Sequence, residues 1–357
     1  MNIGILTFPN STSYGAVLQM YALYRAVETL GHSPEVINYQ NTYMKEQKHF
    51  QNSKWLRRSA GKLLHYQMHS KFQRFEKKRM GCYPAKAIAD PQKLPALTER
   101  YEAVICGSDQ VWNPDITGGD LSYFLNFCDA STNRVAYAPS FGLSEFSDAF
   151  ENAILGDLEK FHALSAREAP GQALISKLTG KDVPLVCDPT FLLGAEDWTS
   201  LEKSHPAAKG EYIFYYTVRS SAALWNRCKA FAKEKGLKIV VVGGNLLKQW
   251  KEKDEQIQYA VDIGPEEWLY LLHHARYVFT NSFHGTAFSI NYHKDFYVEF
   301  SSLTNSRLEQ ITQTLGLAGQ IVGDEPLSGA AVDYYVADRV LTQMRSKSIA
   351  YLKNALK

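Results

Sequence analysis

The sequence predicts an α/β protein with two Rossmann-like domains that face a central cleft. Strand-like apolar runs alternate with helix-like segments along most of the chain, which is typical of a doubly wound, mostly parallel sheet. The polar stretch GAEDWTSLEKSHPAAKGE interrupts that rhythm, which then restarts. A chain of 357 residues is also longer than one ordinary core, so we expect two domains, 1–195 and 196–357.

The first domain begins with a βαβ unit. Residues 3–8 indicate a strand, residues 14–30 carry apolar side chains at helical spacing, and SPEVINY indicates the next strand. Further strands that run into loops are predicted in YEAVICGSDQVWN, RVAYAPSFG, FHALSAREAPG and VPLVCDPTFLL, with helices at 149–163 and 170–178.

The second domain repeats this order. Strands are predicted in EYIFYYTV, LKIVVVGG, ARYVFTNS and DFYVEF, with helices at 221–235, 265–274, 286–292, 307–315 and about 336–356. Ligands of open α/β folds bind at the carboxyl ends of the strands. We therefore expect an acceptor on the first domain and a donor on the second.

Composition narrows the functional class. No apolar run approaches the roughly 20 residues of a membrane span, and the first residues indicate a strand rather than a signal peptide, so a cytoplasmic location is predicted. The five cysteines form no C-x-x-C pair, so neither a disulfide framework nor a zinc site is expected. No Gly-rich dinucleotide or phosphate-binding loop is present, and we expect no cofactor or metal.

The segment from Met44 to Arg79 is strongly basic. It has eleven Lys and Arg residues against two Glu, a net charge of +9. Such a segment can meet an anionic partner, such as a membrane surface or a pyrophosphate-linked lipid; we expect no nucleic acid. The alternative is a solvated helical insertion at about 44–80 that packs on the domain through its apolar side chains, namely Trp55, Leu56, Leu63, Leu64, Phe72 and Phe75.

The stretch TNSFHGTAFSI leads from a strand to a helix through Asn281, Ser282, His284 and Gly285. A helix after Gly285 would offer backbone N–H groups to a phosphate or carboxylate, with His284 beside them as a proton donor. The alternative is a histidine that only caps backbone groups.

Two arginines could bind the same anion. Arg167 in SAREAPG stands where a predicted strand ends, and its guanidinium can hold a carboxylate or phosphate in bidentate fashion. The alternative is a pair with Glu168 or an interdomain carboxylate. Arg307 opens a later helix and could close over the anion.

The loop GSDQVWNP has a composition suited to a sugar. Asp109, Gln110 and Asn113 can bind hydroxyl groups, and the Trp112 indole can cover an apolar ring face. The alternative is that Asp109 caps the following turn. Tyr14 and Gln19 in SYGAVLQ could line the same rim.

Taken in order, SYGAVLQMYAL, VICGSDQVWNP, SAREAPG, VCDPTFLL and TNSFHGTAFSI resemble the polysaccharide pyruvyl transferase family over about residues 1–320. The resemblance implies glycosyltransferase B-type architecture, phosphoenolpyruvate as donor, and a pyruvate ketal formed on a saccharide of a cell-surface polysaccharide or exopolysaccharide. It also implies that Arg167 holds the donor anion and that His284 is the acid. Ser282 stands where family members often have an arginine, so Arg307 or Lys294 would supply the missing cation.

Two other functions remain open. One is a nucleotide-sugar-dependent glycosyltransferase of the same architecture, which would need a larger pocket for a base and a ribose. The other is a non-catalytic protein that binds a saccharide or a lipid pyrophosphate through residues 44–79.

Overall fold

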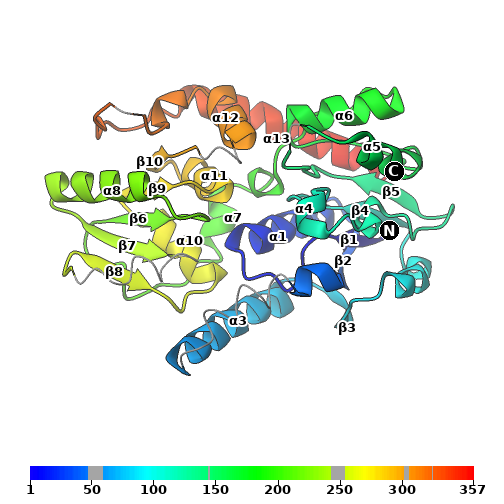
Figure 1. The fold of residues 1–357 in the computed structure, drawn as a ribbon, viewed down its shortest axis with the longest axis horizontal. Coiled ribbons are helices and arrows are strands. Elements are labelled where there is room, and N and C mark those ends of the chain that lie inside the picture. Colours follow the sequence, from blue (N-terminus) through cyan, green and yellow to red (C-terminus); the bar gives the residue numbers. More distant parts are fainter. Residues whose placement is uncertain (47–58, 144, 243–253, 301–304, 324) are drawn as a thin grey trace. The chain divides into compact units, whose positions relative to one another are not determined.

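The computed structural model describes residues 1–46, 59–143, 145–242, 254–300, 305–323 and 325–357 (Figure 1). The centre of the predicted basic insertion, with Trp55, Leu56, Arg57 and Arg58, lies outside the described residues, and so does the double-glycine exit of LKIVVVGG. The chain forms two compact units. Unit 1 comprises Met1–Tyr66, Phe72–Leu192 and Gln343–Lys357, and unit 2 comprises Gln67–Lys71 and Leu193–Thr342.

Unit 1 is built on a parallel sheet of five strands in the order β3-β2-β1-β4-β5 (Figure 1). The strands are β1 (Asn2–Leu6), β2 (Ser33–Tyr39), β3 (Cys82–Ile88), β4 (Ala103–Cys106) and β5 (Asn133–Ala136). The helices assigned to this unit are α1 (Tyr14–Thr29), α4 (Pro114–Thr117), α5 (Asp148–Leu158) and α6 (Ala169–Thr179), with 3-10 turns at Pro91–Lys93, Pro95–Arg100, Leu121–Phe124 and Pro189–Phe191. Helix α3 (Ser59–Arg79) crosses both units.

Two predicted strands of the first domain are reduced to single bridges. Ala163 pairs with Val135, and Ala166 pairs with Leu185, each as an isolated parallel contact. Conversely, β3 was not predicted from the sequence. It is an edge strand whose side chains are all exposed or half-buried, so it lacks the apolar pattern of an interior strand.

Unit 2 has a second parallel sheet, in the order β10-β9-β6-β7-β8. Its strands are β6 (Tyr212–Tyr216), β7 (Lys238–Val242), β8 (Ile257–Ala260), β9 (Tyr277–Thr280) and β10 (Asp295–Val298). Its helices are α7 (Ala195–Thr199), α8 (Ala222–Lys235), α10 (Pro265–His273), α11 (Phe283–Asn291) and α12 (Asn305–Thr314), with a 3-10 turn at Ala318–Gln320.

Helices cover both faces of this second sheet. On one face the Tyr215 ring meets Trp225 of α8 at 4.9 Å, and on the other Phe214 meets Trp268 of α10 at 5.8 Å. Phe288 of α11 joins Trp268 at 5.3 Å, so α10 and α11 share a face. Because neighbouring strand residues point to opposite faces, this arrangement is a doubly wound sheet.

The last helix, α13 (Tyr335–Ala355), ends in unit 1 rather than unit 2. Ser348 Oγ accepts the Cys187 N–H at 2.9 Å, and the Tyr351 hydroxyl donates to the Ala136 carbonyl at 2.9 Å. The expected second domain, 196–357, thus differs from unit 2 at its C-terminal end. The division at Leu192 lies close to the expected boundary.

Candidate functional site

The carboxyl end of β9 leads directly into α11. Ser282 is the N-cap, and its hydroxyl accepts the Gly285 N–H at 3.3 Å. The helix therefore begins at Phe283, three residues earlier than predicted. The prediction was wrong here because Phe283, His284 and Gly285 continue the helix once the serine caps it. His284 thus lies on the first turn of the helix, where the backbone dipole favours an anion.

His284 is buried, with 8% of its surface exposed. Its ring meets the Phe283 ring edge to face at 5.3 Å. Asn281, before the cap, accepts the Val218 N–H at 3.0 Å and donates to the Arg219 carbonyl at 2.9 Å. Its amide therefore ties the exit of β9 to the exit of β6, which fixes the backbone that carries Ser282 and His284.

Gly285 leaves no room for a side chain. A Cβ atom at this position would lie 2.4 Å from Thr280 Oγ1, the atom that accepts the Ser282 N–H at 3.0 Å. The close approach of Thr280 therefore requires glycine and holds the first turn of α11 against the end of β9.

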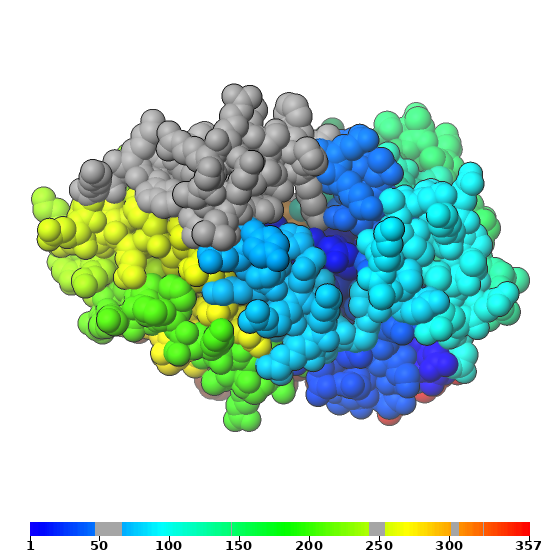
Figure 2. All heavy atoms as spheres, turned by 90° about the horizontal axis from the view of Figure 1, so that it is seen from below, coloured from blue at the N-terminus to red at the C-terminus, as the bar shows by residue number. Residues whose placement is uncertain are grey.

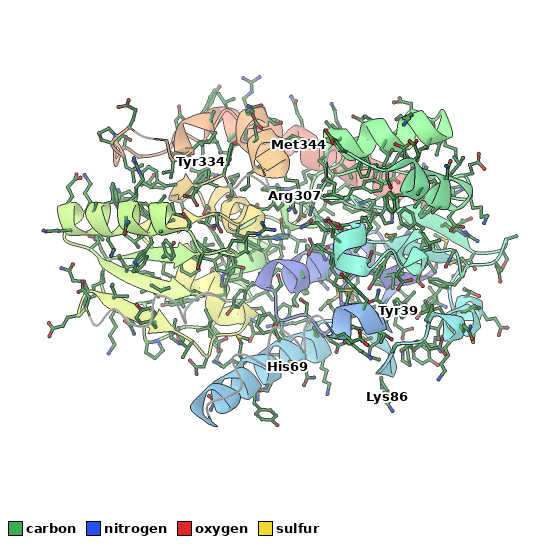
Figure 3. The ribbon with its side chains drawn as sticks, in the orientation of Figure 1. Tyr39, His69, Lys86, Arg307, Tyr334 and Met344 are labelled. Carbon is green, nitrogen blue, oxygen red and sulfur yellow. The ribbon has the colours of Figure 1, made fainter. Side chains whose placement is uncertain are left out.

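The two proposed substitutes for an arginine at 282 lie in different places. Arg307 is buried on α12, a helix that packs against α11 (Figure 3). Lys294 directly precedes β10 and donates to the His273 carbonyl at 2.7 Å. It therefore lies at the amino edge of the sheet, whereas His284 follows the carboxyl end of β9, so the prediction that Lys294 joins His284 at the donor was wrong.

At the carboxyl edge of the first sheet, Arg167 is the centre of a buried ionic network. Its Nη1 donates to Asp188 at 2.8 Å and to Ser108 Oγ at 3.4 Å, and its Nε lies 3.5 Å from Glu168. The Ser140 hydroxyl donates to Glu168 at 2.6 Å. The side chains of Arg167, Glu168 and Asp188 are at most 3% exposed.

Charges within this network act on one another strongly. Burial alone would lower the pKa of Arg167, but the carboxylates of Glu168, Asp188 and Asp109 outweigh burial and raise it. One guanidinium faces three acidic groups, so the network is net acidic. The pair with Glu168 was one alternative from the sequence, and Asp188 was not assigned a role. The sequence feature that could have pointed to Asp188 is the step from Asp188 to Pro189 at the end of the predicted strand in VPLVCDPTFLL.

The neighbouring loop carries strained backbone. Asp109 has φ +77° and Ala138 has φ +51°, and the bridge between Asp109 and Pro139 places them side by side. A non-glycine residue in this region costs roughly 1 kcal/mol or more, and such residues gather at ligand sites. The Asp109 carboxylate accepts the N–H of Gln110, at the start of the following turn. The cap of helix α4 is Asn113, whose side-chain amide donates to Gln110 at 2.9 Å.

Four of the six predicted acceptor residues are buried: Tyr14, Gln19, Trp112 and Asn113. Trp112 is 1% exposed, stacks on Phe124 at 4.8 Å and donates its Nε1–H to the Tyr123 carbonyl, so its ring faces are not open to a sugar. Gln19 is fully buried and donates to Thr7 Oγ1 at 3.1 Å. Tyr14 is buried against Phe72. Only Asp109 and Gln110 of the predicted acceptor set are partly exposed.

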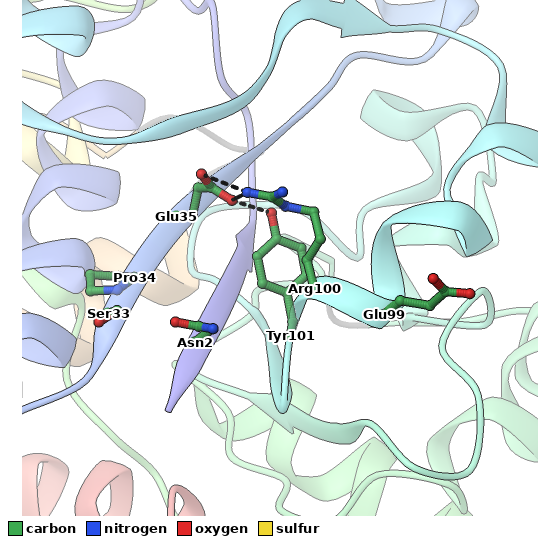
Figure 4. A pocket seen from close by; sticks show the side chains of 7 residues that line it. All are labelled: Asn2, Ser33, Pro34, Glu35, Glu99, Arg100 and Tyr101. Atoms are coloured by element: carbon green, nitrogen blue, oxygen red, sulfur yellow. Dashed lines mark hydrogen bonds and ion pairs between the residues drawn. The ribbon is translucent and has the colours of Figure 1, made fainter.

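A pocket of about 410 Å³ lies at the opposite, amino edge of the first sheet (Figure 4). Arg100 and Tyr101 both point to Glu35 there, and the Tyr101 hydroxyl donates to Glu35 at 2.8 Å. Burial and Glu35 raise the pKa of Tyr101. Glu35 is thus engaged by Arg100 and Tyr101, and the pocket is remote from the strand exits of its own sheet.

The described part of α3 has one buried and one basic face. Phe72 and Phe75 pack on Tyr14 and Tyr21 with ring centroids 5.0 and 5.6 Å apart, as the solvated-insertion alternative expects. Arg74, Lys77 and Lys78 are exposed. Figure 2 shows this part of α3, in light blue, at the surface. No helix among the described residues is both long and apolar enough to cross a membrane.

Comparison with known proteins identifies both family and fold. The family model of polysaccharide pyruvyl transferase matches residues 14–298. No curated protein matches the chain. Among solved structures, UDP-GlcNAc 2-epimerase from Methanocaldococcus jannaschii is similar at a TM-score of 0.54 and 12% identity, covering 97% of this chain and 92% of the epimerase.

Two further structures show the same likeness. HepE of Anabaena in complex with UDP and glucose has a TM-score of 0.51 and 12% identity, with 100% of this chain and 94% of HepE covered. The UDP-GlcNAc 2-epimerase of Neisseria meningitidis, bound to UDP-GlcNAc, has a TM-score of 0.52 and 11% identity, with 99% of this chain and 94% of the epimerase covered. At these identities the likeness shows the fold alone. It confirms two Rossmann-like α/β domains of glycosyltransferase B type.

Proposed function

Because the chain belongs to the polysaccharide pyruvyl transferase family, we propose that it transfers the pyruvyl group of phosphoenolpyruvate to a saccharide of a cell-surface polysaccharide. The product would be a pyruvate ketal. The observation that carries this proposal is His284 on the first turn of α11, inside the region that the family model matches. It supports an acid beside an anion-binding helix end.

The chemistry needs one proton on carbon and two hydroxyl groups. In our proposal His284 protonates the methylene carbon of phosphoenolpyruvate, which makes C2 electrophilic. The oxygen of one sugar hydroxyl adds to C2, and the hydroxyl proton returns to the now deprotonated His284. The oxygen of a second hydroxyl then bonds to C2 as the C2–O bond to phosphate breaks, and its proton leaves with the phosphate as hydrogen phosphate, which closes the ketal. The helix end would stabilise the phosphate charge as it leaves.

Arg167 is our candidate for a further contact to the donor, although two neighbouring carboxylates already bind its guanidinium. Glu168 and Asp188 hold the guanidinium in place but also compete with a donor anion for it. Arg307, buried on α12 against α11, is the other candidate cation. We propose Asp109 and Gln110 as acceptor contacts, since these two are partly exposed on a strained strand exit.

A nucleotide-sugar donor is the second candidate. Ser282 occupies the position at which family members often have an arginine, and HepE, which shares the fold, was solved with UDP and glucose. A UDP-sugar would need a pocket for the uracil and ribose in addition to the phosphates.

The two donors can be separated by ligand-dependent stability. A ligand that binds the folded protein raises its unfolding temperature in proportion to the logarithm of its concentration above Kd. We expect phosphoenolpyruvate to raise the unfolding midpoint and UDP-glucose to leave it unchanged, with inorganic phosphate as the control for a general anion effect. Stabilisation by UDP-glucose but not by phosphoenolpyruvate would support the glycosyltransferase alternative.

We also propose that the protein is cytoplasmic and that its basic segment, residues 44–79, contacts the inner face of the membrane. The exposed Arg74, Lys77 and Lys78 support an anionic partner, such as a lipid pyrophosphate that carries the acceptor saccharide. Anionic headgroups attract such cations at about 1 kcal/mol each.

A further inference from the structure

Two consecutive histidines and a glutamate converge at the amino edge of the sheet in unit 2. His273 is the last residue of α10, His274 is its C-cap, and Glu202 lies three residues beyond the end of α7. His273 Nδ1 is 2.8 Å from one Glu202 oxygen, and His274 Nε2 is 3.4 Å from the other. The three ligand atoms lie within 4.8 Å of one another.

The glutamate of this cluster is unusually enclosed for a carboxylate. Its side chain is 7% exposed, against 33% for His273 and 47% for His274. A buried carboxylate is costly unless it is paired or coordinates a metal. Here the two imidazoles face it from the solvent side, so an ion bound between the three groups would remain accessible to water.

Each imidazole contacts a tyrosine ring. The His273 ring lies parallel to Tyr292, with centroids 4.3 Å apart, and the His274 ring lies 4.1 Å from Tyr270. Ligands whose side chains are already oriented lose less conformational entropy when a metal binds. Lys294 donates to the His273 carbonyl at 2.7 Å, so its ammonium group is bound to the backbone beside the cluster.

We propose that Glu202, His273 and His274 form a binding site for a divalent cation of the zinc class. Two imidazole nitrogens and one carboxylate, with an open position for water, are a known zinc ligand set. Magnesium and calcium prefer all-oxygen ligands, so the two histidines disfavour them. Zinc–ligand distances of about 2.0–2.2 Å place ligand atoms roughly 3–3.5 Å apart. The two histidine–glutamate distances here are 2.8 and 3.4 Å, and all three ligand atoms lie within 4.8 Å of one another, so small side-chain shifts would complete the site.

This site is separate from the candidate transfer site. It lies before the amino end of β9, whereas His284 follows the carboxyl end of the same strand. Four strand residues span roughly 10 Å or more. A metal here would therefore join the segment after α7 to the end of α10 and stabilise unit 2, without touching the donor at His284.

The test is a zinc titration of tag-free, metal-stripped protein, followed by both calorimetry and thermal unfolding. We expect one zinc per chain, a higher unfolding midpoint with zinc, and no effect of magnesium at the same concentration. His273→Asn and His274→Gln keep an amide near each ligand nitrogen, and each should weaken zinc binding about tenfold or more.

His293→Asn is the matched control, because His293 is an exposed histidine of the same unit with one acidic partner, Asp338, at 2.8 Å. It should bind zinc as the unchanged protein does. Unfolding midpoints measured without metal show whether each variant folds. No zinc binding at micromolar concentration, or equal affinity in the His273 and His274 variants, would overturn the proposal and leave a hydrogen-bonded cluster only.

Discussion

Arg167 and Asp188 form a 2.8 Å ion pair in the interior of unit 1, and neither side chain is more than 3% exposed. The guanidinium also faces Glu168, so these charges meet one another inside the protein rather than water, with carboxylates in excess. A buried pair of this kind gives little net stability by itself, but removing one partner leaves the other uncompensated.

We therefore expect Asp188→Asn to lower the free energy of unfolding by about 3–5 kcal/mol. The measurement is urea unfolding followed by fluorescence. Glu151→Gln is the control, because Glu151 pairs with the 65% exposed Lys177 at 2.7 Å, and surface pairs contribute about 1 kcal/mol or less. Equal losses of unfolding free energy in the two variants would mean that the buried network contributes no more to stability than a surface ion pair.

Gly285→Ala should destabilise the protein and lower any activity that depends on His284. The added methyl group would meet Thr280 Oγ1 at 2.4 Å and push the first turn of α11 away from β9. We expect a loss of about 1–3 kcal/mol, as for other overpacked sites, measured by urea unfolding.

Two further variants control for the chemistry of this substitution. Gly156 lies in α5 with no atom near the position of a Cβ, so Gly156→Ala should be neutral or stabilising by up to about 1 kcal/mol. Adding Thr280→Ala should restore part of the Gly285→Ala loss by removing the clashing oxygen. A harmless Gly285→Ala would mean that the contact with Thr280 relaxes freely.

Glu267 should make stability depend on pH. Burial alone would raise its pKa, but Lys71, the Gly264 N–H and Lys203 outweigh burial and hold the pKa of Glu267 below its ordinary value. A lowered folded-state pKa stabilises the protein above the unfolded-state pKa of about 4.3, and this stabilisation is lost as pH falls through the folded value.

The stability difference between the unchanged protein and Glu267→Gln should thus be largest near neutral pH and shrink below about pH 4. Urea unfolding across this range measures it, with the exposed Glu255 as the matched position for a Gln control. If the difference in unfolding free energy does not change with pH, Glu267 contributes through packing and hydrogen bonds rather than through its charge.

The interior strands were predictable because burial on both faces leaves a run of apolar residues. β6, β7 and β9 are buried at nearly every position, and each lies inside a stretch that we identified from the sequence. The edge strands β3 and β8 were missed because half of an edge strand faces solvent or loops. Their pairing depends on neighbours remote in sequence.

The site was predictable only in part. The positions of His284 and Arg167 at strand exits were predicted because each follows an apolar run. Their partners could not be read from the sequence, because the bridge between Ala166 and Leu185 brings Asp188 to Arg167 from 21 positions further along the chain. Trp112 was misplaced for the same reason: its loop folds back so that the indole stacks on Phe124 in the core.

The basic face of α3 should bind anionic vesicles. Arg74→Gln, Lys77→Gln and Lys78→Gln together should reduce co-sedimentation with vesicles that contain anionic lipid, by about 1 kcal/mol of binding free energy per charge. The binding should weaken as salt rises. Exposed lysines of unit 2, Lys209, Lys233 and Lys238, provide a triple Gln control. If neither triple variant nor salt alters the binding, the cations of α3 do not bind lipid, and their role is limited to favourable interaction with the carboxyl end of the helix dipole.

The central claim concerns His284 as the acid that activates phosphoenolpyruvate. The most direct measurement is phosphate release from phosphoenolpyruvate by the purified protein in the presence of saccharide extracted from the source organism's cell surface, with the ketal identified by its methyl NMR signal. We predict release and ketal formation by the unchanged protein, and loss of both by at least about a hundredfold in His284→Gln, with an unchanged unfolding midpoint. A folded His284→Gln variant that forms the ketal at the original rate would contradict the account.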